Sequence, residues 1–166
     1  MALDDRAAYI SVKLGHLAVQ RDREAYLHDL VDLCARAVDA ERSTVYLVDP
    51  RRNELVARFA QRTAVEIRLP LGKGIAGTVA QTGETINVPD AYADPRFDRN
   101  VDLRSGFRTQ NMLVVPVWSV DGKRVTGVIQ VLNKRGGTFE RSDQMDLERI
   151  ADGIAPALEH LAVEAS

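Results

Sequence analysis

Lys134 and Asp143 are the residues whose spacing most clearly predicts a specific contact. The apolar, β-branched run 127–132 predicts a buried strand, and the Asn-Lys-Arg-Gly-Gly that follows it predicts a turn. Ser142 is suited to cap the helix that comes next. Lys134 would then lie near the end of a strand and Asp143 near the start of a helix, at one corner of the fold. This spacing predicts an ion pair between the last strand and the last helix.

The glycine-rich segment 71–80 is a second candidate for chemistry. Gly74-Ile-Ala-Gly77 opens a predicted helix, whose first N–H groups carry the positive end of the helix dipole. Glycine allows an anion to approach such a helix start closely. The segment is not a P-loop, because its Gly-Lys is not followed by Ser or Thr. Most glycine-led helix starts bind nothing, so an anion site here needs support from other parts of the chain.

The sequence contains no grouping that predicts catalysis or metal binding. The histidines all fall on predicted terminal helices, beside no nucleophile motif and at no metal-ligand spacing: His16, His28 and His160. Cys34 is the only cysteine, and its place in the apolar phase of a helix predicts a buried structural thiol. One cysteine and three histidines cannot form a thiolate zinc site. The aspartates of the segment 90–102 stand close to arginines and are better interpreted as solvated turn residues than as an acid–base pair: Asp90, Asp94, Asp98 and Asp102. We therefore predict no enzyme and no metal site.

The composition predicts one globular domain without a charge-driven attraction to nucleic acid. The chain has 166 residues, of which 45% are hydrophobic and 28% charged, and its net charge is −2. Its longest apolar runs, such as 112–118, are far too short to cross a bilayer. The first residues lack the basic-then-apolar pattern of a signal peptide. We expect a cytoplasmic protein that binds neither membranes nor nucleic acid.

Apolar periodicity predicts an α/β fold with a central six-stranded, mostly antiparallel sheet. Apolar residues recur at helical spacing over 4–19, 23–39 and 143–163. Runs rich in β-branched residues, separated by turn signals, predict strands over 43–48, 54–60, 65–69, 85–88, 112–119 and 124–132. The polar segment 90–110 is too long for a simple connection and is the candidate lid. We expect the terminal helices on one face of the sheet and the lid over the other.

Several separate strings in the chain resemble the cyclic-nucleotide-binding type of GAF domain, found in phosphodiesterases and bacterial adenylate cyclases. They are Gly74-Ile-Ala-Gly77, the lid segments 86–97 and 101–111, and the series Asn133-Lys134, Phe139 and Asp143. They follow the family's order and spacing over roughly residues 24–163, although Gln144 stands where the family usually has an acidic residue. The resemblance implies a GAF domain over 23–163, preceded by an N-terminal helix over 1–22 that serves as a linker or in dimerisation.

The resemblance also implies a ligand site above the sheet and beneath the lid. The backbone of Ile75 and Ala76 is implied to meet the phosphate and ribose, and the backbone of Asp98 the phosphate. The side chains implied to complete the site are Asp102 and Thr109 at the ribose or phosphate, Ser105 and Thr44 at the base edge, Phe107 stacked on the purine, and Gln130 at the sugar. The series Asn133, Lys134, Phe139 and Asp143 lies away from the ligand in the family and is implied to act as a structural lock.

Three positions differ from the family's cGMP-binding pattern. Ala60 stands where an aromatic residue flanks the base, although Phe59 is its neighbour. Gln61 stands where a carboxylate reads the N–H groups of guanine, and Gln130 stands where the last strand carries a carboxylate. An amide both donates and accepts hydrogen bonds and can therefore pair with adenine. These differences favour cAMP over cGMP.

The resemblance implies a non-catalytic regulatory sensor that needs no cofactor, takes a cyclic nucleotide as its ligand and signals through its terminal helices. We expect a homodimer through the first and last helices, and an output domain in cis or in trans. The apolar residues expected at the dimer seam are Ile10, Leu14, Leu17, Leu158 and Leu161.

The sequence leaves one other function open and disfavours a second. The chain would bind another ligand, or none, if it serves mainly as a module for dimerisation and signalling. Free methionine-R-sulfoxide reductases share the GAF fold, but their chemistry needs several reactive cysteines. Cys34 alone cannot supply both a nucleophile and a resolving thiol.

Overall fold

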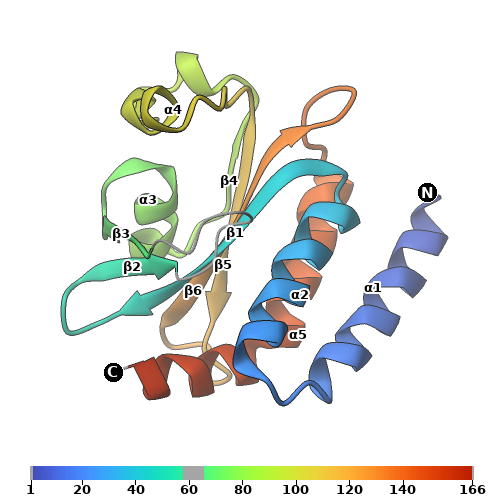
Figure 1. The fold of residues 1–166 in the computed structure, drawn as a ribbon. Coiled ribbons are helices and arrows are strands. Elements are labelled where there is room, and N and C mark those ends of the chain that lie inside the picture. The colour runs from blue at the N-terminus through green and yellow to red at the C-terminus, as the bar shows by residue number, and fades with distance from the viewer. Residues whose placement is uncertain (1, 58–65, 166) are drawn as a thin grey trace.

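The computed structural model describes residues 2–57 and 66–165, which form a layered α/β fold (Figure 1). The helices are α1 (Leu3–Ala18), α2 (Arg23–Ala37), α3 (Gly74–Thr82), the 3-10 turn η1 (Ala91–Ala93), α4 (Arg99–Ser105) and α5 (Arg141–Ala165). The strands are β1 (Ala40–Asp49), β2 (Glu54–Ala57), β3 (Ile67–Pro70), β4 (Ile86–Val88), β5 (Met112–Trp118) and β6 (Val125–Lys134). Helices α1, α2 and α5 lie on one side of the sheet, and α3 and α4 lie on the other (Figure 1).

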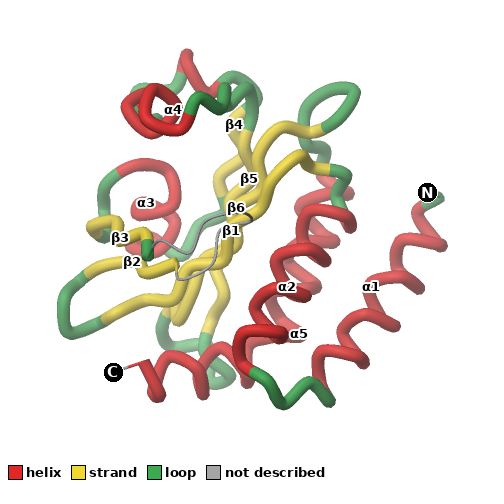
Figure 2. The backbone as a smooth tube through the Cα atoms, viewed as in Figure 1, coloured by secondary structure: helices red, strands yellow, loops and turns green. Residues whose placement is uncertain are grey.

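The six strands form one sheet in the order β3-β2-β1-β6-β5-β4, which Figure 2 shows as a single curved layer. Every hydrogen-bonded pair of neighbouring strands is antiparallel. Hairpins join β1 to β2 and β5 to β6. The connection from β3 to β4 contains α3 and crosses from one edge of the sheet to the other. The predicted six-stranded antiparallel sheet, with terminal helices on one face and the lid on the other, is confirmed.

The two faces of the sheet support two separate hydrophobic cores, because successive strand residues point to opposite sides. Val45 and Leu47 of β1 belong to the core beneath α1, α2 and α5. Tyr46, which lies between them, belongs to the core on the opposite face, together with Val128 of β6 and Val79 of α3. The alternation in the central strands therefore builds a large structural core on one face and a smaller core beneath the lid on the other.

The apolar stripes of the terminal helices are used within the chain. Ile10, Leu17, Leu158 and Leu161 are at most 7% exposed, and Leu14 packs against the same core. The neighbouring helices and the sheet of the same chain therefore already cover most of this apolar surface. A homodimer, with a seam through the first and last helices, stays a prediction. Within the described residues, we find no helix whose length and apolar character would suit a bilayer span.

Two local expectations near the last helix were wrong. Asn133 and Lys134 end strand β6 and are not part of the turn, which begins after them. Ser142 does not precede α5, which begins at Arg141; the carboxylate of Asp143 accepts the backbone N–H of Glu140 at 2.7 Å instead. The N-cap of α2 is Asp22, whose carboxylate accepts the N–H of Ala25 at 2.8 Å.

The lid contains more regular structure than its polar sequence indicated. It includes η1 and the seven-residue helix α4, which the carboxylate of Asp98 caps by accepting the N–H of Asn100 at 2.9 Å. Gly106 ends α4 in the left-handed conformation, with φ of 72°. The predicted strand over 54–60 is present as β2 up to Ala57, and its remaining residues lie outside the described part of the chain.

Gly127 marks the closest approach of β6 to its neighbours. A Cβ atom at this position would lie 2.6 Å from Cδ2 of Leu158 and 2.7 Å from the carbonyl oxygen of Tyr46. The leucine side chain could rotate away, but the backbone of β1 is held by its strand pairing on both sides.

We therefore expect Gly127→Ala to lower the free energy of unfolding by about 1–3 kcal/mol, the usual cost of overpacking a core. Urea denaturation would measure the change. Gly137→Ala is the matched control, because a Cβ there meets nothing within 4 Å. Equal losses in the two variants would contradict a local steric cause.

Candidate functional site

A cavity of about 250 Å³ lies between the sheet, the start of α3 and the lid. The strands contribute Tyr46 from β1, Ile67, Leu69 and Pro70 from β3, Met112 from β5, and Gln130 and Leu132 from β6. The start of α3 contributes Lys73, Gly74, Ile75 and Ala76, and the lid contributes Phe97, Asp98, Val101 and Thr109. The cavity therefore has apolar walls with a few polar groups, the combination typical of small-molecule sites.

The polar end of the cavity is the amino terminus of α3. Lys73 is the N-cap residue, and within the described chain no side chain caps this helix. The first N–H groups of the helix consequently have no partner inside the helix, and they carry the positive end of its dipole. Lys73, an exposed residue, also lines the cavity and carries a positive charge. An anion is the ligand group that this end of the cavity would accept.

Gly77 allows α3 to begin this close to the sheet. The Gly77 carbonyl accepts the N–H of Gly72 at 2.9 Å. A Cβ atom on Gly77 would lie only 2.6 Å from the carbonyl oxygen of Pro70 at the end of β3. The glycine therefore permits the backbone contact that fixes the start of α3 against the cavity.

Tyr46 and Gln130 form the floor of the cavity. Burial raises the pKa of Tyr46 to about 12, and a hydrogen bond with the Gln130 side chain opposes this rise. Gln130 lies opposite Thr44 on β1 and Val114 on β5. It is the amide-bearing side chain among the described residues that line the cavity.

The lid is held together by the buried carboxylate of Asp102. Its Oδ2 accepts the Tyr92 hydroxyl and the Thr109 N–H, each at 2.7 Å, and its Oδ1 accepts the Thr109 hydroxyl at 2.8 Å. The hydrogen bond to Asp102 raises the pKa of Tyr92. These contacts join η1, α4 and the end of the lid into one unit.

Aromatic and cationic side chains pack around the ring of Tyr92. The Arg108 guanidinium lies 4.4 Å from the ring centroid, and that of Arg99 lies 5.2 Å away. The ring of Phe97 is 5.4 Å from the ring of Tyr92 and extends the stack to the cavity wall. The lid thus presents a preformed apolar surface to the cavity.

The structure brings part of the implied ligand site together. Of the implied residues, those that line the cavity are Ile75, Ala76, Asp98, Thr109 and Gln130. Those that are described but lie outside its lining are Thr44, Asp102, Ser105 and Phe107. Phe59, Ala60 and Gln61 lie outside the described residues. The assignment of all these residues to a ligand stays a prediction.

Two of the residues outside the lining have protein partners that explain their positions. The carboxylate of Asp102 is directed into the lid, where Tyr92 and Thr109 use both of its oxygens. The ring of Phe107 lies beneath the Arg42 guanidinium, 3.9 Å from it, at the rim of the fold. A ligand that contacted either side chain would first have to change these contacts.

Sequence reasoning missed several residues of the cavity, chiefly Tyr46, Lys73, Phe97 and Met112. Two of them had usable signals. Tyr46 follows Thr44 at the two-residue spacing of a strand face, and Lys73 directly precedes the helix start at Gly74.

The Asp143 carboxylate is the centre of a charge cluster where the end of β6 meets the terminal helices. Its side chain is 2% exposed, and its Oδ1 lies 3.0 Å from Nζ of Lys134 and 3.0 Å from Nη1 of Arg6. Nζ of Lys134 also donates to the Val38 carbonyl at the end of α2, at 2.8 Å. Arg6 reaches a second carboxylate, Asp146, at 3.2 Å. The cluster therefore joins β6 to all three terminal helices.

The residue before this lysine binds the end of the lid. Asn133 has a left-handed backbone, with φ of 60°, and its Oδ1 accepts the N–H groups of Gln110 and Asn111 at 2.6 and 3.3 Å. Its Nδ2 donates to the Arg108 carbonyl at 2.8 Å. In return, Oδ1 of Asn111 accepts the N–H of Lys134 at 2.9 Å. We call residues 108–111, which these bonds hold, the lid hinge.

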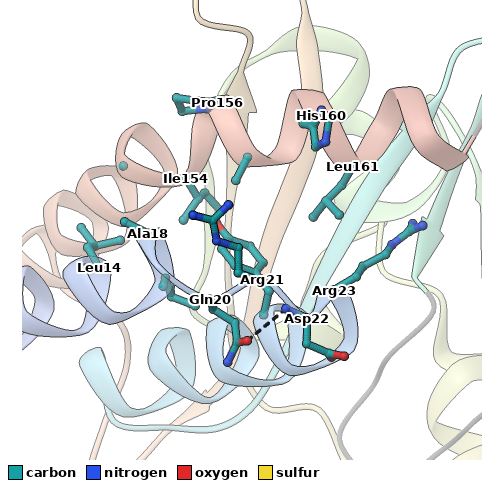
Figure 3. A pocket seen from close by; sticks show the side chains of 14 residues that line it. Leu14, Ala18, Gln20, Arg21, Asp22, Arg23, Ile154, Pro156, His160 and Leu161 are labelled. Atoms are coloured by element: carbon teal, nitrogen blue, oxygen red, sulfur yellow. Dashed lines mark hydrogen bonds between the residues drawn. The ribbon is translucent and has the colours of Figure 1, made fainter.

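A second, larger cavity of about 430 Å³ lies between α1, α2 and α5 (Figure 3). Its apolar wall includes Leu14, Ile154 and Leu161. Charges of both signs border it in the connection between α1 and α2, where the Asp22 N–H donates to the Gln20 side chain at 3.0 Å. This cavity lies on the opposite side of the sheet from the lid.

Cys34 is fully buried in the core beneath the terminal helices, and burial raises the pKa of its thiol. Within the described parts of the chain, no three His, Cys, Asp or Glu side chains are grouped so as to hold a metal ion.

Comparison of the sequence finds relatives among cyclic-nucleotide phosphodiesterases. The chain is 35% identical over 150 residues to the probable 3′,5′-cyclic phosphodiesterase of Caenorhabditis elegans. The aligned region covers 82% of this chain and 20% of that protein. It is 38% identical over 133 residues to the dual 3′,5′-cyclic-AMP and -GMP phosphodiesterase 11A of Takifugu rubripes. This aligned region covers 72% of this chain and 14% of that protein. The chain thus spans a fifth or less of the length of these relatives.

Comparison of the fold finds a small enzyme as well. The free methionine-R-sulfoxide reductase of Neisseria meningitidis, solved with its substrate, superposes with a TM-score of 0.78 at 27% identity, over 100% of this chain and 96% of that one. The family model of the GAF domain matches residues 22–158, which include the whole sheet, both faces of the cavity and most of α5. The chain therefore belongs to the GAF domain family.

Proposed function

We propose that this GAF domain is a non-catalytic regulatory sensor that binds a cyclic purine nucleotide beneath its lid. The observation that carries the proposal is the composition of the 250 Å³ cavity. The start of α3 and Lys73 suit a cyclic phosphate, while Gln130 and Thr109 offer hydrogen bonds to a sugar or base edge. Apolar walls from the strands, and Phe97 of the lid, suit a flat base.

The relatives support a regulatory role for this ligand class. Both are named as phosphodiesterases of cyclic nucleotides, and the region they share with this chain is a small part of each. A domain of this size within such an enzyme is suited to sensing the nucleotide, so we propose ligand binding for this chain and not phosphodiester hydrolysis.

Ligand binding would change the position of the lid. The cavity is slightly smaller than the roughly 300–1,000 Å³ of most ligand sites, and we propose that the lid moves outward to admit a nucleotide. Because Asp102 joins the lid into one unit, we infer that the lid moves about the lid hinge. A nucleotide that bound one lid position more tightly would shift the population toward that position. A homodimer and an output domain, in cis or in trans, would receive this change through the terminal helices.

Within the class, we propose a preference for cAMP over cGMP. Gln130 presents an amide to the cavity, and an amide can donate to and accept from adenine. Gln61, the other amide that favours adenine in the sequence, lies outside the described residues.

A reductase activity has less support. Sulfoxide reduction by a protein thiol needs an accessible thiolate, whereas Cys34 is buried and burial raises its pKa. It also lies in the core beneath the terminal helices, on the other face of the sheet from the cavity.

Thermal unfolding with a panel of ligands would test the proposal. At 100 times its dissociation constant, cAMP should stabilise the protein by about 2.7 kcal/mol, with a smaller effect from cGMP at the same concentration. Free methionine sulfoxide should have no effect. No shift with either nucleotide at millimolar concentration would contradict the proposal.

Gln130→Glu would test the base preference in the same panel. The substitution should lower the affinity for cAMP and reduce the difference in affinity between cAMP and cGMP, because a carboxylate accepts hydrogen bonds but cannot donate them. Gln81→Glu, outside the cavity lining, makes the same charge change and should leave the preference as it was.

We expect Lys134→Ala to lower stability by about 3 kcal/mol, the lower end of the range for breaking a buried pair, because Arg6 still neutralises Asp143. It should also weaken nucleotide binding, since Lys134 and Asn111 share a hydrogen bond at the lid hinge. Urea denaturation and calorimetric titration would measure the two effects. An unchanged melting temperature together with unchanged affinity would exclude the lock.

A further inference from the structure

We propose that Arg6, on helix α1, is a positioning residue for the lid, so that docking of α1 sets the state of the lid hinge. Helix α1 lies outside residues 22–158, which the GAF family model matches. The consequence for ligand affinity rests on the proposed function, but the coupling between α1 and the hinge does not.

The charged groups around Asp143 are balanced only while α1 is docked. Two cations, Arg6 and Lys134, face two carboxylates, Asp143 and Asp146, and the first of these carboxylates is 2% exposed. Undocking of α1 would remove one cation and leave a net negative charge in a poorly hydrated site. Nearby Arg149 approaches only Asp146, at 3.8 Å, and is itself half exposed. Removing one partner of such a cluster is costly, because the remaining charge stays buried.

Hydrogen bonds at the end of β6 connect this charge cluster with the lid hinge. Lys134 shares Oδ1 of Asp143 with Arg6, and its backbone N–H is bound by the side chain of Asn111. Asn133, the preceding residue, holds three backbone groups of the lid hinge. Any shift of the end of β6 that follows the loss of Arg6 would therefore act on the hinge directly.

Two further hydrogen bonds connect the start and the end of the lid to the segment between Lys134 and Asp143. The side chain of Asn87, in β4, donates to the Phe139 carbonyl at 2.9 Å, and that of Asn111 donates to the Gly137 carbonyl at 3.1 Å. Both roots of the lid are thus bound to the segment 133–143, which has Lys134 near one end and Asp143 at the other. The ion pair between Arg6 and Asp143 fixes the Asp143 end of this segment.

Arg6 adds a charged contact to a helix whose packing against α5 leaves a cavity. Leu14 contacts α5 closely at Gly153, but the 430 Å³ cavity opens around it and toward the end of α1 (Figure 3). A 16-residue helix is marginally stable by itself in water, so docking contacts decide whether α1 remains in place. Arg6 supplies the charged contact at the opposite end of the helix from this cavity.

Reciprocity follows from this arrangement. If docked α1 stiffens the hinge, a ligand that prefers the stiff hinge must strengthen the docking of α1 by the same factor. The first helix would then be a detachable regulatory arm whose release loosens the lid.

Amide hydrogen exchange of the ligand-free full chain would test the coupling. In Arg6→Gln, the amides of Gln110 and Asn111 should exchange about 5- to 10-fold faster, in the lower part of the usual coupling range. Core amides, such as those of Val115 and Ile129, should be unchanged.

Three further variants make the result specific. Arg6→Lys keeps the charge and should restore part of the protection. Asp146→Asn removes one of the two ion pairs of Arg6 and leaves Asp143 in place. It should accelerate amide exchange in the lid hinge, but less than Arg6→Gln does. Lys13→Gln removes a cation from the same helix at a site beside the Tyr9 ring, and should leave the hinge unchanged.

Unchanged hinge exchange in Arg6→Gln would overturn the proposal, as would a uniform rise across all amides, which would indicate only a general loss of stability. A failure of Arg6→Lys to restore any protection would also overturn it. Because no nucleotide is present, these results are independent of whether the cavity binds one.

Discussion

The buried carboxylate of Asp143 is the constraint from which much of this structure follows. A carboxylate with 2% of its side chain exposed must be neutralised and hydrogen-bonded, and here Lys134, Arg6 and the Glu140 N–H meet that need. Each partner comes from a different element, so satisfying one charge fixes the end of β6, the start of α5 and the position of α1. The Val38 carbonyl, bound by Lys134, adds α2 to the same point.

The ligand cavity is positioned by the same corner although it does not touch Asp143. The left-handed backbone of Asn133 directs its side chain onto the lid hinge, and the Asp102 contacts then transmit that placement through the lid. On the opposite wall, Gly77 allows the uncapped start of α3 to face the cavity. The end of the cavity at the start of α3 is therefore fixed to the sheet, whereas the apolar cover depends on the hinge. This division suits a sensor, because binding and closure can be coupled without moving the core.

Local patterns in the sequence predicted the elements well and the contacts between them poorly. The terminal helices and the strands have strong apolar periodicity, and the spacing of Lys134 and Asp143 predicted the ion pair that is present. Helix α4 was missed because it is short, and because the partners of its buried residue Asp102 lie elsewhere in the lid. Arg6 was missed because its partner lies 137 residues away. An apolar stripe does not reveal which surface buries it, and the stripes of the terminal helices pack within the chain.

A backbone NMR titration with cAMP would test the account most directly. We predict saturable shifts of the Ile75 and Ala76 amides, at the start of α3, and of the Gln110 amide, at the lid hinge, with one shared dissociation constant. This result would show that the cavity binds the nucleotide and that the hinge responds to it. Saturable shifts confined to the cavity between α1, α2 and α5, or no saturable shifts at all, would contradict the account.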